Sequence, residues 1–180
     1  MAGPDETTGF VQPVPVVFAA GAEGDWRIER IAAVRGEGLP MAARLARIEG
    51  TRPAAAAAWA LRGTTSNERY VTRAEKEALR AAQPPLGRPD STRAALIPVR
   101  KSAAWWDLAQ DERRRILEER SRHVSIGLRY LPAVARRLYH CRDLGEPFDF
   151  LTWFEYAEAD AEGFEELVGE LRRSPEWEYV

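Results

Sequence analysis

The feature that most constrains the fold is the change of apolar period along the second half of the chain. Alternating and helical patterns follow one another there, with strands expected at about 94–100, 134–141 and 148–157 and helices at about 103–131 and 160–173. The closing residues EWEYV are expected to complete the sheet as a further strand. This βαββαβ order is that of a ferredoxin-like unit, whose antiparallel sheet carries helices on one face. The expected fold class is therefore α+β.

Two strand patterns place unusual side chains among apolar ones. In VARRLYHC, alternation puts Arg136 on the same face as Val134 and Leu138. In FDFLTWFEY, Thr152 shares a face with four aromatic residues, one of which is Phe154. A guanidinium and a hydroxyl in such surroundings indicate a pocket for an anion. The structural alternative is an ion pair at a sheet edge or interface, because a guanidinium stays charged and must find acceptors.

Histidine is scarce in this chain, which has only two. His123 lies on or beside an apolar stripe of helical period, formed by Ile116, Leu117, Val124, Leu128 and Leu131. A neutral imidazole nitrogen is a common metal ligand, so His123 is the first candidate for such a role and His140 the second. The alternative, and the more frequent one for a lone histidine on an apolar helix face, is a core residue held by hydrogen bonds.

The first half of the chain is less regular. The segments VPVVFAA and WALRG are typical of strands, and the five alanines before Trp59 are expected to extend the second of them. Thr72 and Glu75 form a capping box that opens a helix in TRAEKEALRAAQ. The segment QPPLGRPDS, rich in proline and glycine, is expected to be a loop. Between Trp26 and Ile48 no period is clear.

Composition excludes several classes of partner. The 26 basic and 28 acidic residues leave a net charge of −2, which gives no general attraction to nucleic acid or to an anionic membrane. No segment approaches the ~20 apolar residues that span a bilayer, and MAGPDETTGF lacks the pattern of a secretory signal, so a cytoplasmic protein is expected. Cys141 is the only cysteine, which rules out an intramolecular disulfide and CxxCH attachment of heme and indicates a packed thiol.

Several motifs, taken in order, resemble the chlorite dismutase family of heme enzymes: RKSAAWW, then His123, ARRLYH, FDFLTWFE and FEELVGELRRSPEWEYV. The likeness covers about the last ~90 residues, and LRGTTSNERYVTRAE more loosely. It implies that residues 1–90 form a truncated N-terminal ferredoxin-like half and residues 91–180 a heme-binding one. Together the two halves would form a dimeric α+β barrel, and the short lineage of the family implies a homodimer.

The resemblance also implies a site around heme b. His123 would be the proximal iron ligand, Glu176 the carboxylate on its other ring nitrogen, and Arg136 the mobile arginine on the distal face. A carboxylate in that place fixes the tautomer of the imidazole and makes it a stronger ligand. An arginine that is always charged can attract an oxyanion and keep an anionic fragment near the metal.

Further residues receive roles by the same resemblance. Thr152, Phe154 and Leu138 match positions that line the distal pocket, although each is as readily explained as ordinary sheet core. Gln83 matches a glutamine that holds the arginine in one orientation, and its alternative is a solvated loop residue.

The heme propionates have implied partners as well. Lys101 and Tyr70 match residues that donate to them, and Trp105 would pack against the macrocycle. A compact ammonium suits a carboxylate, which makes Lys101 the better donor of the two.

The implied reaction converts chlorite to chloride and dioxygen through an oxo-iron species and formation of an O–O bond, with chlorite detoxification as the expected purpose. Two alternatives remain open at this point: a heme biosynthesis enzyme like the coproheme decarboxylases, and a heme-binding protein without catalysis. The former generally lack an arginine at the position of Arg136, and storage of heme does not need a charged distal group.

Overall fold

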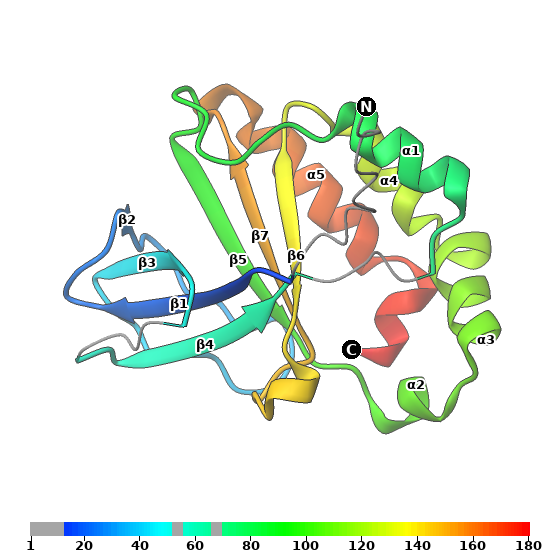
Figure 1. Cartoon of the computed structure of the whole chain (residues 1–180), viewed down its shortest axis with the longest axis horizontal. Coiled ribbons are helices and arrows are strands. Elements are labelled where there is room, and N and C mark those ends of the chain that lie inside the picture. Colours follow the sequence, from blue (N-terminus) through cyan, green and yellow to red (C-terminus); the bar gives the residue numbers. More distant parts are fainter. Residues whose placement is uncertain (1–12, 52–55, 66–69) are drawn as a thin grey trace, which may run out of the picture.

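The computed structural model describes residues 13–51, 56–65 and 70–180, and these form one seven-stranded antiparallel sheet with helices. The strand order is β2-β3-β1-β4-β6-β7-β5. The strand bounds are Pro15–Gly21 (β1), Trp26–Arg27 (β2), Arg44–Glu49 (β3), Trp59–Thr64 (β4), Arg93–Val99 (β5), Ala135–His140 (β6) and Phe150–Tyr156 (β7). In Figure 1, β1, β3 and β4 run across the direction of β5, β6 and β7.

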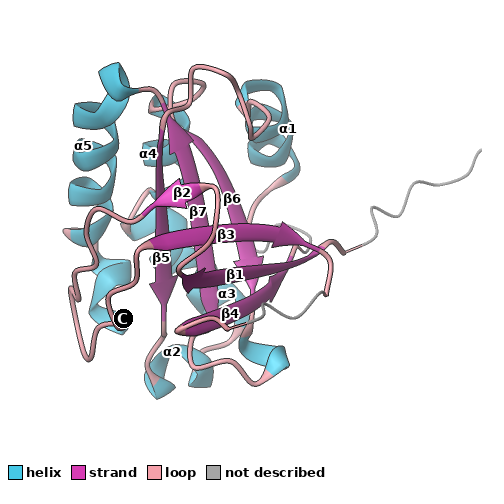
Figure 2. Ribbon diagram, turned by 90° about the vertical axis from the view of Figure 1, so that its left-hand side faces the viewer, coloured by secondary structure: helices cyan, strands magenta, loops and turns pink. Residues whose placement is uncertain are grey.

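The helices belong mainly to the second half of the chain. They are Arg73–Ala82 (α1), Ala103–Asp107 (α2), Gln110–Arg114 (α3), His123–Arg129 (α4) and Ala161–Arg172 (α5). A π-helix, Arg115–Arg120, continues α3, and short 3₁₀ helices lie at Arg142–Leu144, Glu158–Asp160 and Pro175–Tyr179. Figure 2 shows the helices on one side of β5, β6 and β7 and the strands of the first half on the other.

The sheet of β5, β6 and β7 therefore has a separate core on each face. One core joins it to the first half through Val16, Phe18, Ala20, Leu45, Leu61, Tyr139, Cys141, Leu151 and Trp153. The other joins it to α5 through Val134, Phe154, Tyr156, Phe164, Leu167 and Val168. Because side chains alternate along a strand, Trp153 and Phe154 enter different cores. Each large apolar side chain so buried contributes about 1.5–3 kcal/mol.

The α+β class and the order of elements predicted for residues 94–173 are confirmed. β6 pairs with β7, and β7 with β5, in antiparallel register. The helix at Arg73–Ala82 opens with the predicted capping box, in which the Glu75 amide donates to Thr72 Oγ1 at 3.3 Å. Residues 83–91 are a loop, as expected. The division of the chain into halves at residue 90 stays a prediction.

Two predictions about strands are wrong. The closing residues EWEYV lie almost entirely in the 3₁₀ helix and do not add a strand. This segment is held by its own contacts instead, since the Ser102 amide donates to the Tyr179 carbonyl at 2.8 Å and Glu176 turns inward. Ala56 to Ala58 are a turn and a bend, with Ala56 at a φ of 52°, because the link from β3 must cross to the other edge of β1 before β4 can begin.

Parts of two further predictions cannot be compared with the structure. Ala54 and Ala55, and the first ten residues on which the absence of a secretory signal was argued, lie outside the described residues. Within the described ranges, no helix has the length and apolar character needed to cross a membrane.

Candidate functional site

Three charged or titratable side chains from distant parts of the chain meet behind α4. His123 is the first residue of α4, and its Nδ1 lies 2.6 Å from Oε2 of Glu176 on the C-terminal 3₁₀ helix. The other oxygen of this carboxylate, Oε1, accepts from Nζ of Lys101 at 2.8 Å. A carboxylate at Nδ1 selects the tautomer with its proton there, which leaves Nε2 as a free acceptor. The structure thus brings together the predicted pair of His123 and Glu176.

The electrostatics of this cluster favour an ionised carboxylate. Glu176 is only 7% exposed, and burial by itself would raise its pKa. The charges and hydrogen bonds of His123 and Lys101 outweigh burial and lower the pKa of Glu176 to about 2. At neutral pH the site therefore holds a permanent negative charge directly behind the imidazole.

Two residues that position this cluster were not predicted. Ser121 accepts the amide proton of Glu176 on its Oγ at 2.8 Å, which ties the C-terminal segment to the residues just before α4. The carboxylate of Glu118 accepts the amide proton of Val124 at 2.7 Å and so anchors the first turn of α4. Between them, Arg122 has a φ of 55°, the left-handed conformation that separates the π-helix from α4. No sequence period signals these contacts.

Arg136 reaches the same face of α4 as His123. It lies on β6, and its guanidinium rests on the bare backbone of Gly127, where an added Cβ would come within 2.7 Å of Cζ. Gly127 follows His123 by four residues, so the two lie one turn apart on one helix face. Burial lowers the pKa of the Arg136 guanidinium, which nevertheless remains charged at neutral pH. No described residue forms a recorded ion pair with it.

The other predicted distal residues fall into two groups. Leu138 and Thr152 lie opposite each other in the register of β6 and β7, and Leu138 is 44% exposed despite being aliphatic. Phe154 lies opposite Arg136 but is buried in the α5 core, 5.3 Å from Phe164 between ring centroids. Arg136, Leu138 and Thr152 therefore share a partly open face, whereas Phe154 supports it from within the core.

Gln83 contacts Arg136 at its main chain. It is the C-cap of α1, and its Nε2 donates to the main-chain carbonyl of Arg136 at 2.6 Å. Its part in orienting the arginine stays a prediction. The glutamine holds the strand from which the guanidinium projects.

The predicted propionate partners surround Trp105. Its ring is buried, with Nζ of Lys101 4.7 Å from the ring centroid and the ring of Tyr70 at 6.2 Å. The Lys101 ammonium is buried against Glu176, and its role as a propionate donor stays a prediction. The Tyr70 hydroxyl accepts from Arg113 at 3.3 Å. Nε1 of Trp105 is a buried donor that has no partner among the described residues.

Cys141 is a buried free thiol, as predicted. Its Sγ donates to the Phe148 carbonyl at 3.0 Å, and burial raises the pKa of the thiol to about 12. It belongs to the core between the two sets of strands and faces away from the side that carries Arg136.

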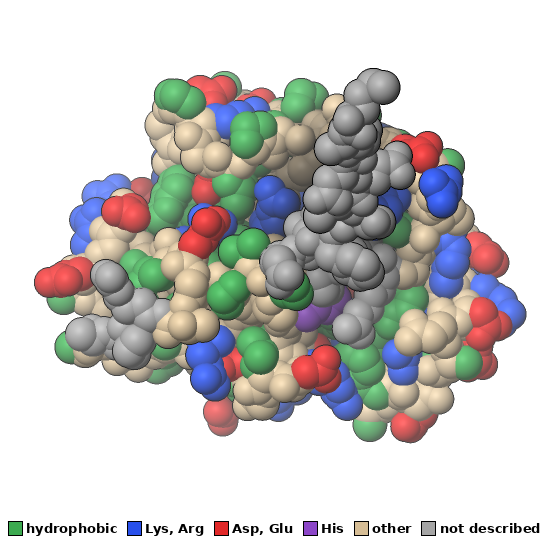
Figure 3. Space-filling view, in the orientation of Figure 1, with side chains coloured by type: hydrophobic (Ala, Val, Ile, Leu, Met, Phe, Trp, Pro, Cys, Tyr) green, Lys and Arg blue, Asp and Glu red, His purple; other side chains and the backbone are tan. Residues whose placement is uncertain are grey.

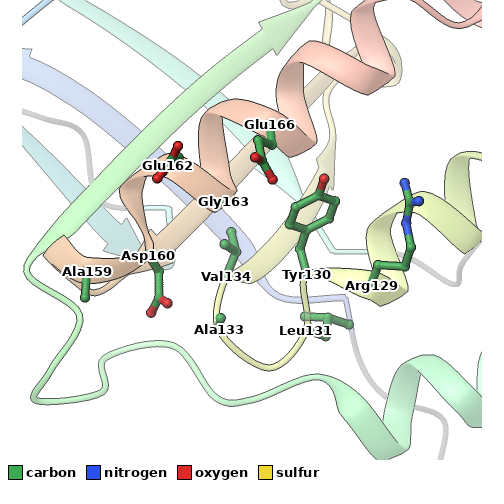
Figure 4. Close-up of a pocket in the computed structure, with 10 residues that line it drawn as sticks. All are labelled: Arg129, Tyr130, Leu131, Ala133, Val134, Ala159, Asp160, Glu162, Gly163 and Glu166. Atoms are coloured by element: carbon green, nitrogen blue, oxygen red, sulfur yellow. The ribbon is translucent and has the colours of Figure 1, made fainter.

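Two hollows lie outside this cluster. One, of about 310 Å³, lies between the end of α4 and the start of α5, where Figure 4 shows Tyr130 and Glu166 among its lining residues. The other, of about 650 Å³, is lined by residues that include Trp106, Arg142 and Asp149. Neither is lined by His123 or Arg136. On the face seen in Figure 3, basic, acidic and apolar side chains are mixed, without a broad basic area.

The residues of the His123 cluster fit a heme group. No described residue hydrogen-bonds Nε2 of His123, which can therefore bind iron. The space over Gly127, which has no Cβ, holds only the end of the flexible Arg136 side chain, so a flat ring would approach α4 once that side chain moves aside. Within the part of the chain that the structure describes, the N–H of Trp105 has no acceptor and the guanidinium of Arg136 has no ion-pair partner, and an anionic group would satisfy both. The exposed side chain of Leu138 offers an apolar surface beside them.

Comparisons with known proteins point to one family. The chlorite dismutase family model matches residues 31–180. A chlorite dismutase of Ideonella dechloratans is 38% identical over 86 residues, which are 48% of this chain and 28% of the relative, so the match spans less than a third of that protein. Of solved structures, dimeric chlorite dismutase from Nitrobacter winogradskyi is 57% identical, with a TM-score of 0.86 over 92% of this chain and 94% of that one. Chlorite dismutase from Candidatus Nitrospira defluvii in complex with imidazole is 29% identical, with a TM-score of 0.55 over 74% and 50%.

Proposed function

We propose that this chain, which belongs to the chlorite dismutase family, is a heme b enzyme that converts chlorite to chloride and dioxygen. The observation that carries the proposal is the meeting, on one face of α4, of two unlike groups. One is an imidazole whose far nitrogen is held by a carboxylate, and the other is a guanidinium with no anionic partner among the described residues. The reaction balances without a co-reactant, because the two oxygen atoms of one chlorite leave as one dioxygen.

Heme would be held from several sides. His123 would bind the iron through Nε2, and the Trp105 indole would donate to a propionate. Gly127 would allow the ring to approach α4 closely. When bound, the heme iron supplies the redox chemistry that breaks the chlorine–oxygen bonds and joins the oxygens. Non-covalent heme b is proposed because the chain has no CxxCH motif.

The proximal residues control the strength of the imidazole ligand. Glu176 accepts the proton on Nδ1 as a hydrogen bond, which fixes the ring and makes Nε2 more basic. Lys101 holds the same carboxylate from its other oxygen. A low pKa keeps Glu176 ionised, so the ligand keeps this character over the whole neutral range.

The distal residues bind and retain the anion. The Arg136 guanidinium attracts chlorite and, by its fork of N–H donors, keeps the chlorine-containing fragment close until the second oxygen is transferred. Gln83 steadies the main chain at Arg136. Leu138 and Thr152, with Phe154 packed behind them, would form a mostly apolar surround that limits access of water.

Assembly and biological role belong to the same proposal. The relative from Nitrobacter winogradskyi is dimeric, and we expect a homodimer here too, with twice the 20.2 kDa mass of the chain in light scattering. Removal of chlorite in the cytoplasm is the proposed role.

The decisive experiment measures oxygen with an electrode after chlorite is added to the heme-loaded protein, with free hemin and a heme-treated His123→Ala variant as controls. We expect the wild-type protein to release one dioxygen per chlorite and the two controls to release none. Bleaching of heme without oxygen would overturn the proposal and redirect attention to coproheme decarboxylation or heme carriage.

A further inference from the structure

The loop of residues 83–92 lies against a part of β6 that has no neighbouring strand. β4 pairs with β6 at a single position, Thr64 with His140, so among the described residues the outer edge of β6 from Ala135 to Tyr139 has no partner strand. The loop connects α1 to β5 and passes over the end of the sheet where β6 begins (Figure 1). An open edge exposes main-chain groups that can fray or pair wrongly, so a covering segment stabilises it.

Three separate contacts fasten this loop, which we call the strap. At its start, Gln83 donates to the carbonyl of Arg136. At its centre, the Gly87 amide donates to Glu155 Oε2 at 2.5 Å. Next to it, Arg88 donates to the carbonyls of Pro132 at 3.1 Å and Ala133 at 2.8 Å, just before β6. The contacts reach β6, β7 and the turn between α4 and β6.

Glu155 is the most unusual of the strap's anchors. It lies on β7, is 4% exposed, and accepts one proton from Gly87 and one from Trp153 Nε1, the latter at 2.7 Å. No ion pair to a described cation is recorded for it. Burying a carboxylate costs free energy unless its oxygens are satisfied, and here both are satisfied by N–H donors. Gly87 has a φ of 76°, a conformation that glycine adopts without strain and that aims its amide at the carboxylate.

We propose that Glu155 is a positioning residue for Arg136, acting through the strap. The inference rests on the proposed function, in which Arg136 faces the anion. Glu155 holds Gly87, the strap holds Gln83, and Gln83 holds the main chain of β6 at Arg136. The main-chain position from which the guanidinium projects is thus set by a carboxylate on the opposite face of the sheet. Phe154 is the register partner of Arg136 and shares its face, and Glu155, the next residue on β7, points to the other face.

The direct test replaces Glu155 with Gln. An amide offers one acceptor oxygen and presents its NH₂ to the second donor, so one of the two bonds must break. In the protein without heme, we expect faster hydrogen exchange at the Gly87 amide and a shifted ¹⁵N resonance of Arg136 Nε. In the heme-loaded protein, we expect roughly tenfold fewer turnovers before inactivation, as for a catalytic group moved by a fraction of an ångström.

Two arginine variants keep the test decisive if the Glu155 variant misfolds: one weakens the strap at another contact, and the other is a control. Arg88→Gln weakens the strap at a half-buried side chain and should reproduce the same changes. Arg44→Gln is the matched control, because Arg44 also donates to two main-chain carbonyls, those of Gly24 and Asp25, but far from the strap. It should leave the Arg136 resonance and the number of turnovers unchanged.

A double variant separates positioning from general damage. If Glu155 acts through Arg136, Glu155→Gln should add nothing to the loss caused by Arg136→Ala. An equal further loss in that background would overturn the proposal, and so would an unchanged Arg136 resonance in both folded strap variants. If the wild type releases no oxygen, the proposed function fails, while exchange at Gly87 and the Arg136 resonance still decide whether the strap positions the arginine.

Discussion

The two faces of the sheet of β5, β6 and β7 differ in how completely they are packed. Toward the first half of the chain, Tyr139, Leu151 and Trp153 are at most 1% exposed and meet a continuous apolar core. Toward the helices, packing is complete only near α5, and Arg136 and Leu138 lie on a part of the sheet that α4 does not fill with apolar side chains. The first face mainly stabilises the fold, whereas the second is less completely packed and carries the candidate site.

Glycines show the same difference. On the packed face, a Cβ on Gly63 would lie 2.8 Å from Cβ of Tyr139. On the other face, a Cβ on Gly127 would meet only the end of the flexible Arg136 side chain. The Cβ of Tyr139 is fixed by the main chain and by a closely packed core, so a clash with it cannot be relieved. The end of the Arg136 side chain can move away. The same substitution therefore tests both faces.

The largest effect is expected from Glu176→Gln, which disrupts the buried ionic cluster of His123, Lys101 and Glu176 on the helix side. Removing its charge leaves Lys101 buried without a counter-charge, which should lower the free energy of unfolding by about 3–5 kcal/mol. Urea denaturation at pH 7 measures this. Glu49→Gln is the control, since that carboxylate pairs with Arg47 but is 62% exposed, and it should change the free energy by less than about 1 kcal/mol. Equal effects of the two variants would contradict a buried ionic cluster.

Acid should weaken the same cluster. The pKa of Glu176 falls from 4.5 to about 2 on folding, so its contribution is complete above pH 4.5 and disappears as the pH drops through about 2. Acid lowers the free energy of unfolding because the unfolded chain, in which the pKa of Glu176 is higher, takes up the proton first. The contribution that is lost amounts to about 3 kcal/mol. The difference in unfolding free energy between wild type and Glu176→Gln, measured from pH 7 to pH 2, should shrink with acidity. A difference independent of pH would refute this assignment.

Gly63→Ala should have the next effect. Its Cβ must displace the backbone of β4 from Tyr139, and overpacking of a full core costs about 1–3 kcal/mol. Thermal unfolding of the heme-free protein measures the loss. A variant as stable as the wild type would show that the packed face is more yielding than its burial indicates.

Gly127→Ala should have the smallest effect on stability and the opposite sign. Alanine favours a helix interior over glycine by up to about 1 kcal/mol, and the Arg136 side chain can swing aside. The same thermal unfolding should show no loss, while heme titration followed by absorbance should show weaker binding, because the added methyl group occupies the space left against α4. Unchanged heme affinity would argue against a ring lying over Gly127.

The strand and helix order of residues 94–173 could be predicted because it is written in local periods. Alternation in FDFLTWFEY and VARRLYHC correctly separated the side chains of the two faces, and Thr72 with Glu75 marked the start of α1. The strand expected at EWEYV failed because Glu176 gains more from His123 and Lys101 than a strand would gain from its ladder. β2 and β3, short or irregular in pattern, were not foreseen.

The candidate site was predictable only by resemblance, and only in part. His123 and Glu176 meet as that resemblance implied, whereas Lys101 is buried against Glu176 and Gln83 holds the main chain of Arg136. Ser121, Glu118 and Glu155 act by contacts with main-chain amides of other segments. Such contacts leave no period in the sequence, so nothing in the pattern could have indicated them.

By itself, the sequence determined the periods of the elements, the α+β class, the scarcity of histidine and cysteine, and a nearly balanced charge. The tertiary structure alone decided which groups meet: His123 with a carboxylate 53 residues away, Lys101 with the same carboxylate 75 residues away, and Arg136 with Gly127. The physical reason is range. Periodicity records which face of an element avoids water, whereas hydrogen bonds and ion pairs depend on positions within about 3 Å, which only the packing of distant segments sets.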